Sequence, residues 1–497
     1  KTEDRIFFEN EFIKGSISLK GGEIDDLELK TYDKTLKSNQ KIQLLNPSST
    51  KEGYTFNTGW ATNSDIDTPK SDSIWIKDGS NKLSPNNPVK IYFENKNGIR
   101  FERTISIDNK YLFKIKQKLI NNSNKIFKIY PYAIINRNNL PSDLTDFYIL
   151  HEGYTFITGD NVEEVDYDEV EEKKFSKEGS SGVLIQGDKY WMTSIIPEQG
   201  RNFRFDLDYK NKYRASYIDT EGYEVKPNTL IEHNVQSLIG AKEINQINKY
   251  KEDLNIEKLD LIVNYGVLYF IIVPMHKILS YFFNFSGNYG YAIILLTILV
   301  RIIFFPLNQY SMKSMGKMKG LGPEIENLKA RFKDDKQQLQ REMMKLYKIN
   351  GVNPASSCFP ILIQIPIFFS LYKLLLLDLA MRHSPFIWVW QDLSAKDPLT
   401  IFNLFGLLPY SVPSFLEIGL LPVLMGSSMW LQMKLSPQPS GSDEMQKMQK
   451  KIFMLMPLFL TVILAPFAAG LILYWVCTNI LTIIQQYIIN KSIKVKN

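Results

Sequence analysis

The chain contains 497 residues with a formal net charge of +6, and this length exceeds what one hydrophobic core usually supports. We therefore expect two or more domains. Only two cysteines occur, Cys358 and Cys477, and both lie inside apolar runs, so we expect buried, inert thiols and no disulfide-stapled domain. The absence of a G-x-x-x-x-G-K-[ST] motif excludes a phosphate-binding loop of that kind.

Polarity and charge divide the chain at the same place. Residues 1–288 are polar with short alternating apolar runs, whereas residues 289–497 contain long apolar runs separated by basic loops. From residue 289 onward there are 21 Lys+Arg and 11 Asp+Glu, a net of +10, which leaves −4 for the first 288 residues. The two parts therefore face different surroundings. A nucleic-acid binder is not favoured, because the basic residues lie between apolar spans rather than on one soluble face.

Residues 1–240 show the pattern of a large all-β sandwich. Short runs in which apolar and polar residues alternate are separated by Gly, Asn and Pro, which is typical of antiparallel strands joined by turns. The runs with this pattern are GSISLKGGEIDDLELKTY, KIYFENKN, RFERTISI, YLFKIKQKLI, KIFKIYPYAII and YEVKPNTLIEHNVQSLIG.

Few residues in this polar half indicate chemistry. Its two histidines, His151 and His233, are far apart and have no Cys or paired carboxylates at metal-ligand spacing. We expect the acidic run Val162 to Glu172 to be a solvated loop. A sugar-binding or protein-binding face is open as an alternative, although no residue pattern marks one.

Residues 241–288 are predicted to be a linker and an interfacial amphipathic helix. The apolar segment LIVNYGVLYFIIVP (261–274) extends for about 13 residues to Pro274, which is short of the roughly 20 residues that a spanning helix needs. An interfacial helix is therefore favoured. If the segment spanned the membrane instead, the predicted orientation of the chain would be reversed.

Residues 289–497 are predicted to form an α-helical polytopic membrane domain. The run from Ile452 to Ile489 contains no charged residue over 38 positions, nearly twice one bilayer crossing, so we expect a hairpin of two helices with its break at Pro466 to Gly470. With the earlier apolar runs, the total is five spans. Their predicted positions are about 289–309, 357–380, 416–434, 451–468 and 470–490.

Lysine and arginine set the orientation of these spans. The loop 311–350 has ten Lys+Arg against five acids, loop 434–451 has four against two, and the tail KSIKVKN has three lysines and no acid. Loop 381–400 is balanced, with two residues of each sign. By the positive-inside rule, the basic segments are cytoplasmic, and residues 1–288 lie outside.

Arg301 is the most informative residue in the chain. It lies about 12 residues, or roughly 18 Å, from the outer end of its span, and an arginine at bilayer depth usually faces a water-filled interior. Thr297 would share its helix face, whereas snorkelling of Arg301 to the cytoplasmic headgroups is the alternative. Further polar residues in other spans could line the same groove: Gln364, Gln432, Thr478, Asn479, Thr482, Gln485 and Gln486. The alternative for each of them is a role as interhelical glue.

A cytoplasmic helical hairpin is predicted over residues 311–352. Two short amphipathic helices flank the charged turn Asp334-Asp335, and the second ends near Asn350-Gly351. Ahead of them Met312, Met315 and Met318 recur among Lys313 and Lys317. Flexible methionines and lysines could bind varied apolar sequences, lipid headgroups or ribosomal RNA, although an ordinary membrane-surface helix would look the same.

With these residues in view, the second half of the chain closely resembles the YidC/Oxa family of membrane protein insertases. The stretches that match are LVRIIFFPLNQYSMKSMGKMKGL, DDKQQLQREMMKLYKINGVNP, CFPILIQIPIF, DLSAKDPL and GLILYWVCTNILTIIQQYII. The first half resembles the family's Gram-negative periplasmic domain, with KGGEIDDLELKTY as the matching segment. Family members carry a first transmembrane helix before that domain, so we expect this sequence to be a truncated form.

The resemblance implies more than the spacing does. Arg301 matches the family's groove arginine, and Thr297 and Trp475 match positions that contact an incoming segment. It implies insertion and folding of nascent membrane proteins without enzyme activity, metal or cofactor. The implied partners are the Sec translocase (SecYEG and SecDF), the ribosome, the signal-recognition receptor and membrane lipids. Two rival functions are a small-solute transporter, for which the expected internal repeats are lacking, and an anchored sugar-binding receptor.

Overall fold

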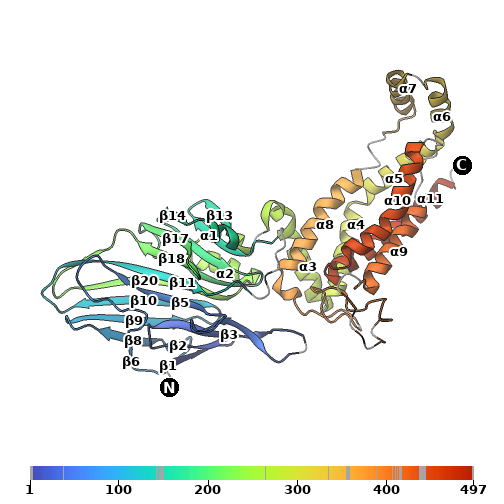
Figure 1. Ribbon diagram of the computed structural model, residues 1–497. Helices are drawn as coiled ribbons and strands as arrows, with labels where there is room; N and C mark the ends of the chain where they lie inside the picture. The colour runs from blue at the N-terminus through green and yellow to red at the C-terminus, as the bar shows by residue number, and fades with distance from the viewer. Residues whose placement is uncertain are drawn as a thin grey trace. The chain divides into compact units, whose positions relative to one another are not determined.

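The computed structural model describes residues 4–36, 38–141, 144, 150–263, 265–333, 335–353, 359–387, 389–405, 407–408, 410, 412–413, 417–435 and 444–494 (Figure 1). The chain divides into two compact units, Lys1–Asn264 and Tyr265–Asn497. The first unit is rich in strands and the second is helical, as the alternation and the long apolar runs predict.

The first unit is a β-sandwich of two mainly antiparallel sheets. Along its hydrogen-bonded path, one sheet contains β14 (Phe175–Gly179), β17 (Phe203–Tyr209), β18 (Tyr213–Asp219), β11 (Phe127–Arg137), β5 (Tyr54–Ala61), β3 (Glu23–Asp33), β2 (Ile13–Ser18), β1 (Arg5–Glu9) and β7 (Lys82–Leu83), with β19 (Tyr223–Val225) on β11 and β4 (Lys41–Leu45) on β3. The other contains β13 (Asn161–Asp166), β12 (Gly153–Thr158), β15 (Gly182–Gly187), β16 (Trp191–Ile195), β20 (Leu230–Ala241), β10 (Leu112–Asn121), β9 (Ile99–Ile107), β8 (Val89–Glu94) and β6 (Ile76–Asp78).

Alternating side chains of these strands fill the space between the sheets. Along β10, Phe113, Ile115 and Leu119 are buried, whereas the intervening Lys114 and Lys116 are exposed. Such a pattern of period two buries one face of each strand and leaves the other in water. The prediction of an all-β sandwich is therefore confirmed, and each of the six predicted runs contributes strands.

The acidic run Val162–Glu172 does not form the expected solvated loop. It forms most of β13 and a short helix, α1 (Tyr167–Glu172). Asp166 and Glu169 make a capping box at the start of α1, which satisfies backbone N–H groups that a helix otherwise leaves without partners. Tyr167 and Val170 are buried, so two apolar side chains in an acidic sequence anchor the segment to the sandwich.

The segment between the sandwich and the first predicted span also differs from the expectation. After α2 (Ile244–Asp253) and two 3₁₀ turns (Leu259–Val263 and Gly266–Leu268), α3 extends from Tyr269 to Ser286. Pro274 lies inside α3 and does not end it. The missing N–H of Pro274 removes one backbone hydrogen bond, and the apolar residues beyond it favour continuing the helix.

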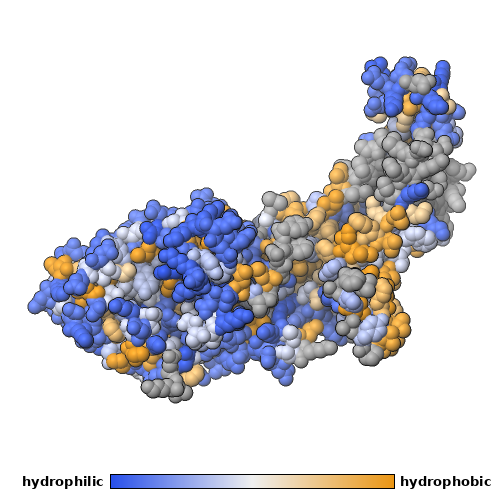
Figure 2. Space-filling model, viewed as in Figure 1, coloured by the Kyte–Doolittle hydropathy of each residue, from blue (hydrophilic) through white to orange (hydrophobic). Residues whose placement is uncertain are grey.

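The other helices of the second unit are α4 (Tyr289–Ile303), α5 (Phe305–Gly320), α6 (Gly322–Arg331), α7 (Lys336–Ile349), α8 (Phe359–Leu377), α9 (Leu420–Leu435), α10 (Glu444–Leu464) and α11 (Ala469–Lys494), with a 3₁₀ turn at Leu379–Met381. They include four that follow the predicted apolar runs (α4, α8, α9 and α11), one that does so in its second part (α10), and the polar pair α6–α7 in the predicted hairpin. In Figure 2, hydrophobic residues gather over these helices, whereas the α6–α7 end and the sandwich surface are mainly hydrophilic.

The five predicted spans are not confirmed by helix length and composition. Within the described ranges, Ala469–Ile489 is the one continuous helix that is long and apolar enough to cross a bilayer. Tyr289–Ile303 and Phe305–Met318 meet the criterion together but are bent by 59°. The helical parts Leu362–Leu377 and Met454–Leu464 are apolar but shorter. The count of five spans therefore stays a prediction.

The expected single helix over 289–309 is broken at Phe304. Asn288 caps α4, because its side-chain oxygen accepts hydrogen bonds from the backbone N–H groups of Gly290 (2.9 Å) and Tyr291 (3.3 Å). Pro306 lacks an N–H, and its ring would clash with the carbonyl four residues earlier in a continuous helix, so α4 ends and α5 begins with Pro306 in its first turn. The bend lies directly after Arg301.

Candidate functional site

Arg301 lies near the end of α4 and its guanidinium contacts α11. Its Nη2 donates a hydrogen bond to the carbonyl oxygen of Thr478 (3.0 Å) and another to the hydroxyl of Thr482. The Thr482 hydroxyl in turn donates to the same Thr478 carbonyl (2.7 Å). One turn of α11 therefore supplies a backbone acceptor and a side-chain acceptor to one positive charge.

A small pocket lies beside this arginine, between α4, α5 and α8. It spans about 260 Å³ of space that includes open solvent, and the centre of a water molecule can occupy only about 10 Å³ of it, so it has room for about one water. The pocket is lined by Val300, Arg301, Phe304, Leu307, Asn308, Ile363, Gln364 and Ile367. The space beside Arg301 is therefore a narrow, mostly apolar pocket with three polar groups, and the wet groove stays a prediction.

The arginine keeps an unused hydrogen-bond donor. Its Nε is buried and has no hydrogen-bond partner within the described part of the chain. The carboxylates that the sequence places in or near other spans are engaged elsewhere: Asp378 faces His276 at 3.5 Å, and Glu417 pairs with Lys396. A buried N–H of a cation that has no acceptor is costly, and a further carbonyl or carboxylate acceptor would relieve that cost.

Two other predicted groove residues lie on α8, which lines the pocket, and on α11, which contacts Arg301. Gln364 lines the pocket, and its Nε2 donates to the hydroxyl of Tyr474 (2.6 Å). Trp475, the next residue on α11, packs edge-on against Phe368 of α8 with ring centroids 4.9 Å apart. The predicted contact of Trp475 with an incoming segment stays a prediction.

The remaining predicted groove residues make separate contacts. Thr297 is fully buried, and its hydroxyl donates to the carbonyl of Ile293 on its own helix (2.7 Å). Asn479 donates to Ser428 on α9 (3.0 Å), and Gln485 donates to the Phe305 carbonyl at the α4–α5 bend (3.3 Å). Gln432 is half-buried on α9, which packs on α10 and α11.

Asn308 is a pocket residue that the sequence analysis did not single out. It is buried on α5 and lines the pocket together with Arg301. The break between α4 and α5 lies between Arg301 and Asn308, so spacing along one helix does not predict that the two side chains line the same pocket.

The residues proposed for recruitment are distributed over α5 and the α6–α7 pair. Met312 and Met318 are half-buried on α5, whereas Lys313 and Lys317 are exposed there. Asp335 caps α7 by accepting a hydrogen bond from the Gln338 N–H (2.9 Å). Asp334 and the side chain of Met315 lie outside the described residues.

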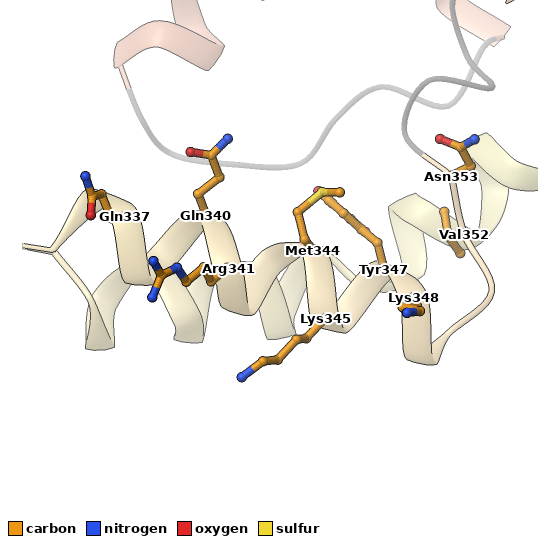
Figure 3. A pocket seen from close by; sticks show the side chains of 9 residues that line it. All are labelled: Gln337, Gln340, Arg341, Met344, Lys345, Tyr347, Lys348, Val352 and Asn353. Carbon is orange, nitrogen blue, oxygen red and sulfur yellow. The ribbon is translucent and has the colours of Figure 1, made fainter.

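A second pocket extends along one side of α7 (Figure 3). Three cationic residues line it at helical spacing, Arg341, Lys345 and Lys348, together with the exposed Met344. Gln337, Gln340 and Met344 point to one side of the helix in this view. The lining of this pocket therefore includes both positive charges and the polarizable side chain of Met344.

Comparison with known proteins adds to this geometry. The family described as 60Kd inner membrane protein matches residues 281–496, and the YidC periplasmic domain matches residues 5–278. The chain is 50% identical over 497 residues to a protein of Pelagibacter ubique named membrane protein insertase YidC, covering 100% of this chain and 88% of that protein. A Rickettsia conorii protein of the same name is 40% identical over 496 residues, covering 98% and 87%.

Among solved structures, an active YidC insertase with its first transmembrane domain resolved matches 98% of this chain and 92% of that chain, with 18% identity and a TM-score of 0.39. Together the two family matches extend over nearly the whole sequence, and they describe an inner-membrane protein with a periplasmic domain. The chain therefore belongs to the YidC family of inner-membrane proteins.

Proposed function

We propose that this protein inserts nascent membrane proteins into the bacterial inner membrane and assists their folding, and that clients pass the Arg301 pocket. The observation that carries the proposal is the state of Arg301: it is half-buried, held by α11, and has a buried N–H without a partner among the described residues. Relatives named membrane protein insertase support the class of function.

The proposed route begins at the cytoplasmic side. A short polar tail of the client enters the pocket and occupies the space that has room for one water. The carbonyl or carboxylate oxygens of the tail then accept hydrogen bonds from Arg301. The α4–α5 bend lets α5 move relative to α8, which widens the pocket between Asn308 and Gln364. The apolar segment of the client then passes Trp475 into lipid, driven by burial of about 20 apolar residues.

In this proposal the chain has the predicted topology, with residues 1–288 in the periplasm and the carboxyl terminus in the cytoplasm. The cationic residues of α7 (Arg341, Lys345 and Lys348) and the lysines of α5 recruit the ribosome and the signal-recognition receptor. The β-sandwich meets the Sec translocase, SecYEG with SecDF. Neither an enzymatic reaction nor a cofactor is required, because the energy comes from transfer of the apolar segment into lipid.

A small-solute transporter would also place an arginine at bilayer depth, but family membership does not favour it. The test is insertion of a purified single-span protein into vesicles that contain the full chain or its Arg301→Met form. We expect the parent to insert the client and Arg301→Met to lose most of that activity. Equal insertion by both forms, or Arg301-dependent uptake of a solute without insertion, would overturn the proposal.

A further inference from the structure

The guanidinium of Arg301 cannot bind a carboxylate through two parallel hydrogen bonds. Its Nη2 carries two hydrogens and already donates to the Thr478 carbonyl and the Thr482 hydroxyl. A paired bond to a carboxylate uses Nη2 together with either Nε or Nη1. Because Nη2 is occupied, the Nε–H, which has no partner among the described residues, is left to make a single hydrogen bond.

Gln364 supplies the pocket with a hydrogen-bond acceptor. Its Nε2 donates to the hydroxyl of Tyr474 (2.6 Å), a side chain of α11 that is 2% exposed. The nitrogen end of the amide is therefore engaged, whereas no described residue donates to Oε1 of Gln364. Since Gln364 and Arg301 both line the pocket, one unpaired acceptor and one unpaired donor belong to the lining of the same small space.

Asn308 adds a group that can both donate and accept. It is buried on α5, and its side-chain amide has no hydrogen-bond partner within the described part of the chain. The residues that line the pocket besides Arg301, Gln364 and Asn308 are apolar. The polar atoms of a bound molecule must therefore be paired by these three side chains.

The lining discriminates between classes of polar group. A carboxylate has acceptors alone, so it would leave Oε1 of Gln364 without a donor and would lose its hydration in a mostly apolar space, which is costly for a charge. An ammonium group has donors alone and would meet the positive charge of Arg301. A backbone residue offers one N–H and one C=O, which match the free acceptor and the free donor and bring no charge.

An extended chain presents these two backbone groups together. In an antiparallel β-pair, a residue exchanges both an N–H bond and a C=O bond with the residue opposite, so both groups point to the same edge of the chain. A pocket with room for about one water is small enough to be filled by the N–H and C=O of one residue at a time. The side chain of that residue plays no part in the match.

We propose that the pocket recognises the peptide backbone of an extended client tail, whose C=O accepts from the Nε–H of Arg301 and whose N–H donates to Oε1 of Gln364. This inference rests on the proposed insertion function and names the chemical group that the site binds. Unpaired backbone groups oppose the entry of an extended chain into hydrocarbon, and the pocket pairs them one residue at a time, whatever the sequence of the tail.

The test compares two synthetic single-span clients that differ in the backbone of the polar tail. The tail of one has ordinary peptide bonds and no charged side chain. In the tail of the other, every second peptide bond is an ester, which replaces the N–H by oxygen. Both are added to vesicles that contain the full chain, and the rates in protein-free vesicles are subtracted. We expect the peptide client to insert about fivefold faster, as the loss of one neutral hydrogen bond predicts.

Variants of the pocket show whether Gln364 causes this preference. Gln364→Met removes the acceptor at similar volume, so the ratio of the two insertion rates should fall to about one. Tyr474→Phe removes the hydroxyl that holds the amide and should lower the ratio in the same direction. The matched control is Gln391→Met, which makes the same substitution at an exposed position on the loop that follows α8 and should keep the parental ratio.

Equal insertion of the two clients by the parent, or a parental ratio in Gln364→Met, would overturn the inference. A third client carries one aspartate in place of an asparagine of the tail. If aspartate speeds insertion while peptide and ester tails insert equally, the recognised group is a carboxylate and the inference is wrong. If the full chain does not insert the peptide client at all, the proposed function itself is contradicted, so the two failures are distinguishable.

Discussion

Among the residues that the structure describes, the guanidinium of Arg301 receives its contacts from α11 and not from a carboxylate. Insertion scales assign about 2.5–3.5 kcal/mol to an arginine at the centre of a spanning helix. Hydrogen bonds to charged groups contribute about 1.5–3 kcal/mol each, so the acceptors on Thr478 and Thr482 offset much of that cost. The Nε–H of Arg301, which has no partner among the described residues, could donate a hydrogen bond to a further acceptor.

Thr482 offers a direct test of how Arg301 is positioned. Its hydroxyl accepts from Arg301 and donates to the Thr478 carbonyl, and Thr482→Val removes both bonds at nearly constant volume. We expect insertion of a single-span client to fall about tenfold, as loss of one such bond predicts. Thr482→Ser keeps the hydroxyl and should insert at nearly the parental rate; equal loss in both variants would contradict the role of the hydrogen bond.

His233 makes the stability of the β-sandwich dependent on pH. It is fully buried between Tyr217 and Tyr223, whose hydroxyls lie 3.1 and 3.2 Å from its two ring nitrogens. Burial lowers the pKa of His233 from 6.5 to about 4, so the neutral form is favoured in the folded state. The unfolded chain binds more protons between these values, and stability must fall as the pH is lowered from 6.5 towards 4.

The expected loss over that range is about 3 kcal/mol. Hydrogen exchange of strand β20 in the full chain, corrected for the intrinsic pH dependence, measures it. His233→Gln should have lower stability at neutral pH but a much flatter dependence between pH 6.5 and 4. A parental slope in that variant would mean that other groups dominate, such as Glu198, which lies 3.3 Å from the ring.

At the scale of elements, Asp397 connects the loop that follows α8 to the start of α9. Its Oδ1 accepts hydrogen bonds from the Trp390 indole N–H and the Leu399 N–H, both at 3.0 Å, and its Oδ2 accepts from the Leu421 N–H at 2.6 Å. Gly419 packs so closely on Asp397 that a Cβ there would lie 2.5 Å from the Asp397 Cβ. The carboxylate thereby satisfies backbone groups that the start of a helix leaves free.

Asp397→Asn tests this connection with little change in volume. The amide replaces one acceptor with a donor, which opposes an N–H and leaves it unsatisfied, so we expect a loss of about 1–3 kcal/mol in the stability of the helical unit. Thermal unfolding of the full chain in detergent measures it. Asp392→Asn is the control on the same loop, since the partners of its carboxylate among the described residues are nearby loop residues. A larger effect there would contradict the assignment.

At the scale of the whole molecule, regular patterns allowed most of the architecture to be predicted. Alternation identified strands such as β10, and long apolar runs identified the helical unit. Prediction failed where two or three residues decide the outcome: the capping box around Asp166 converts an acidic run into α1, and Pro274 is tolerated inside α3.

The site was predictable only in part, for a related reason. Arg301 stands out because a charge inside an apolar run is rare, but its partners depend on helix rotation and on the bend at Phe304. Thr297, which shares the helix face by spacing, bonds to its own backbone, whereas Asn308 reaches the pocket. Spacing along one helix cannot reveal which side chains of another helix meet it.

The division of the chain into two units allows us to predict which of them is needed for insertion. The pocket lies wholly in the helical unit, so a chain that begins at residue 241 should retain most of its insertion activity for a client with a short tail. Insertion into vesicles by the shortened and full chains measures this. A complete loss with intact helices would favour a receptor role for the sandwich.

The most direct measurement follows the path of the client. A photo-crosslinking residue replaces Gln364 at the pocket or, as a matched control, Phe459 on α10, which is 63% exposed. During insertion of a single-span client, we predict crosslinks from position 364 to its polar tail that are lost in Arg301→Ala, and few from position 459. Abundant crosslinks at position 459 with none at 364 would contradict passage of clients beside Arg301.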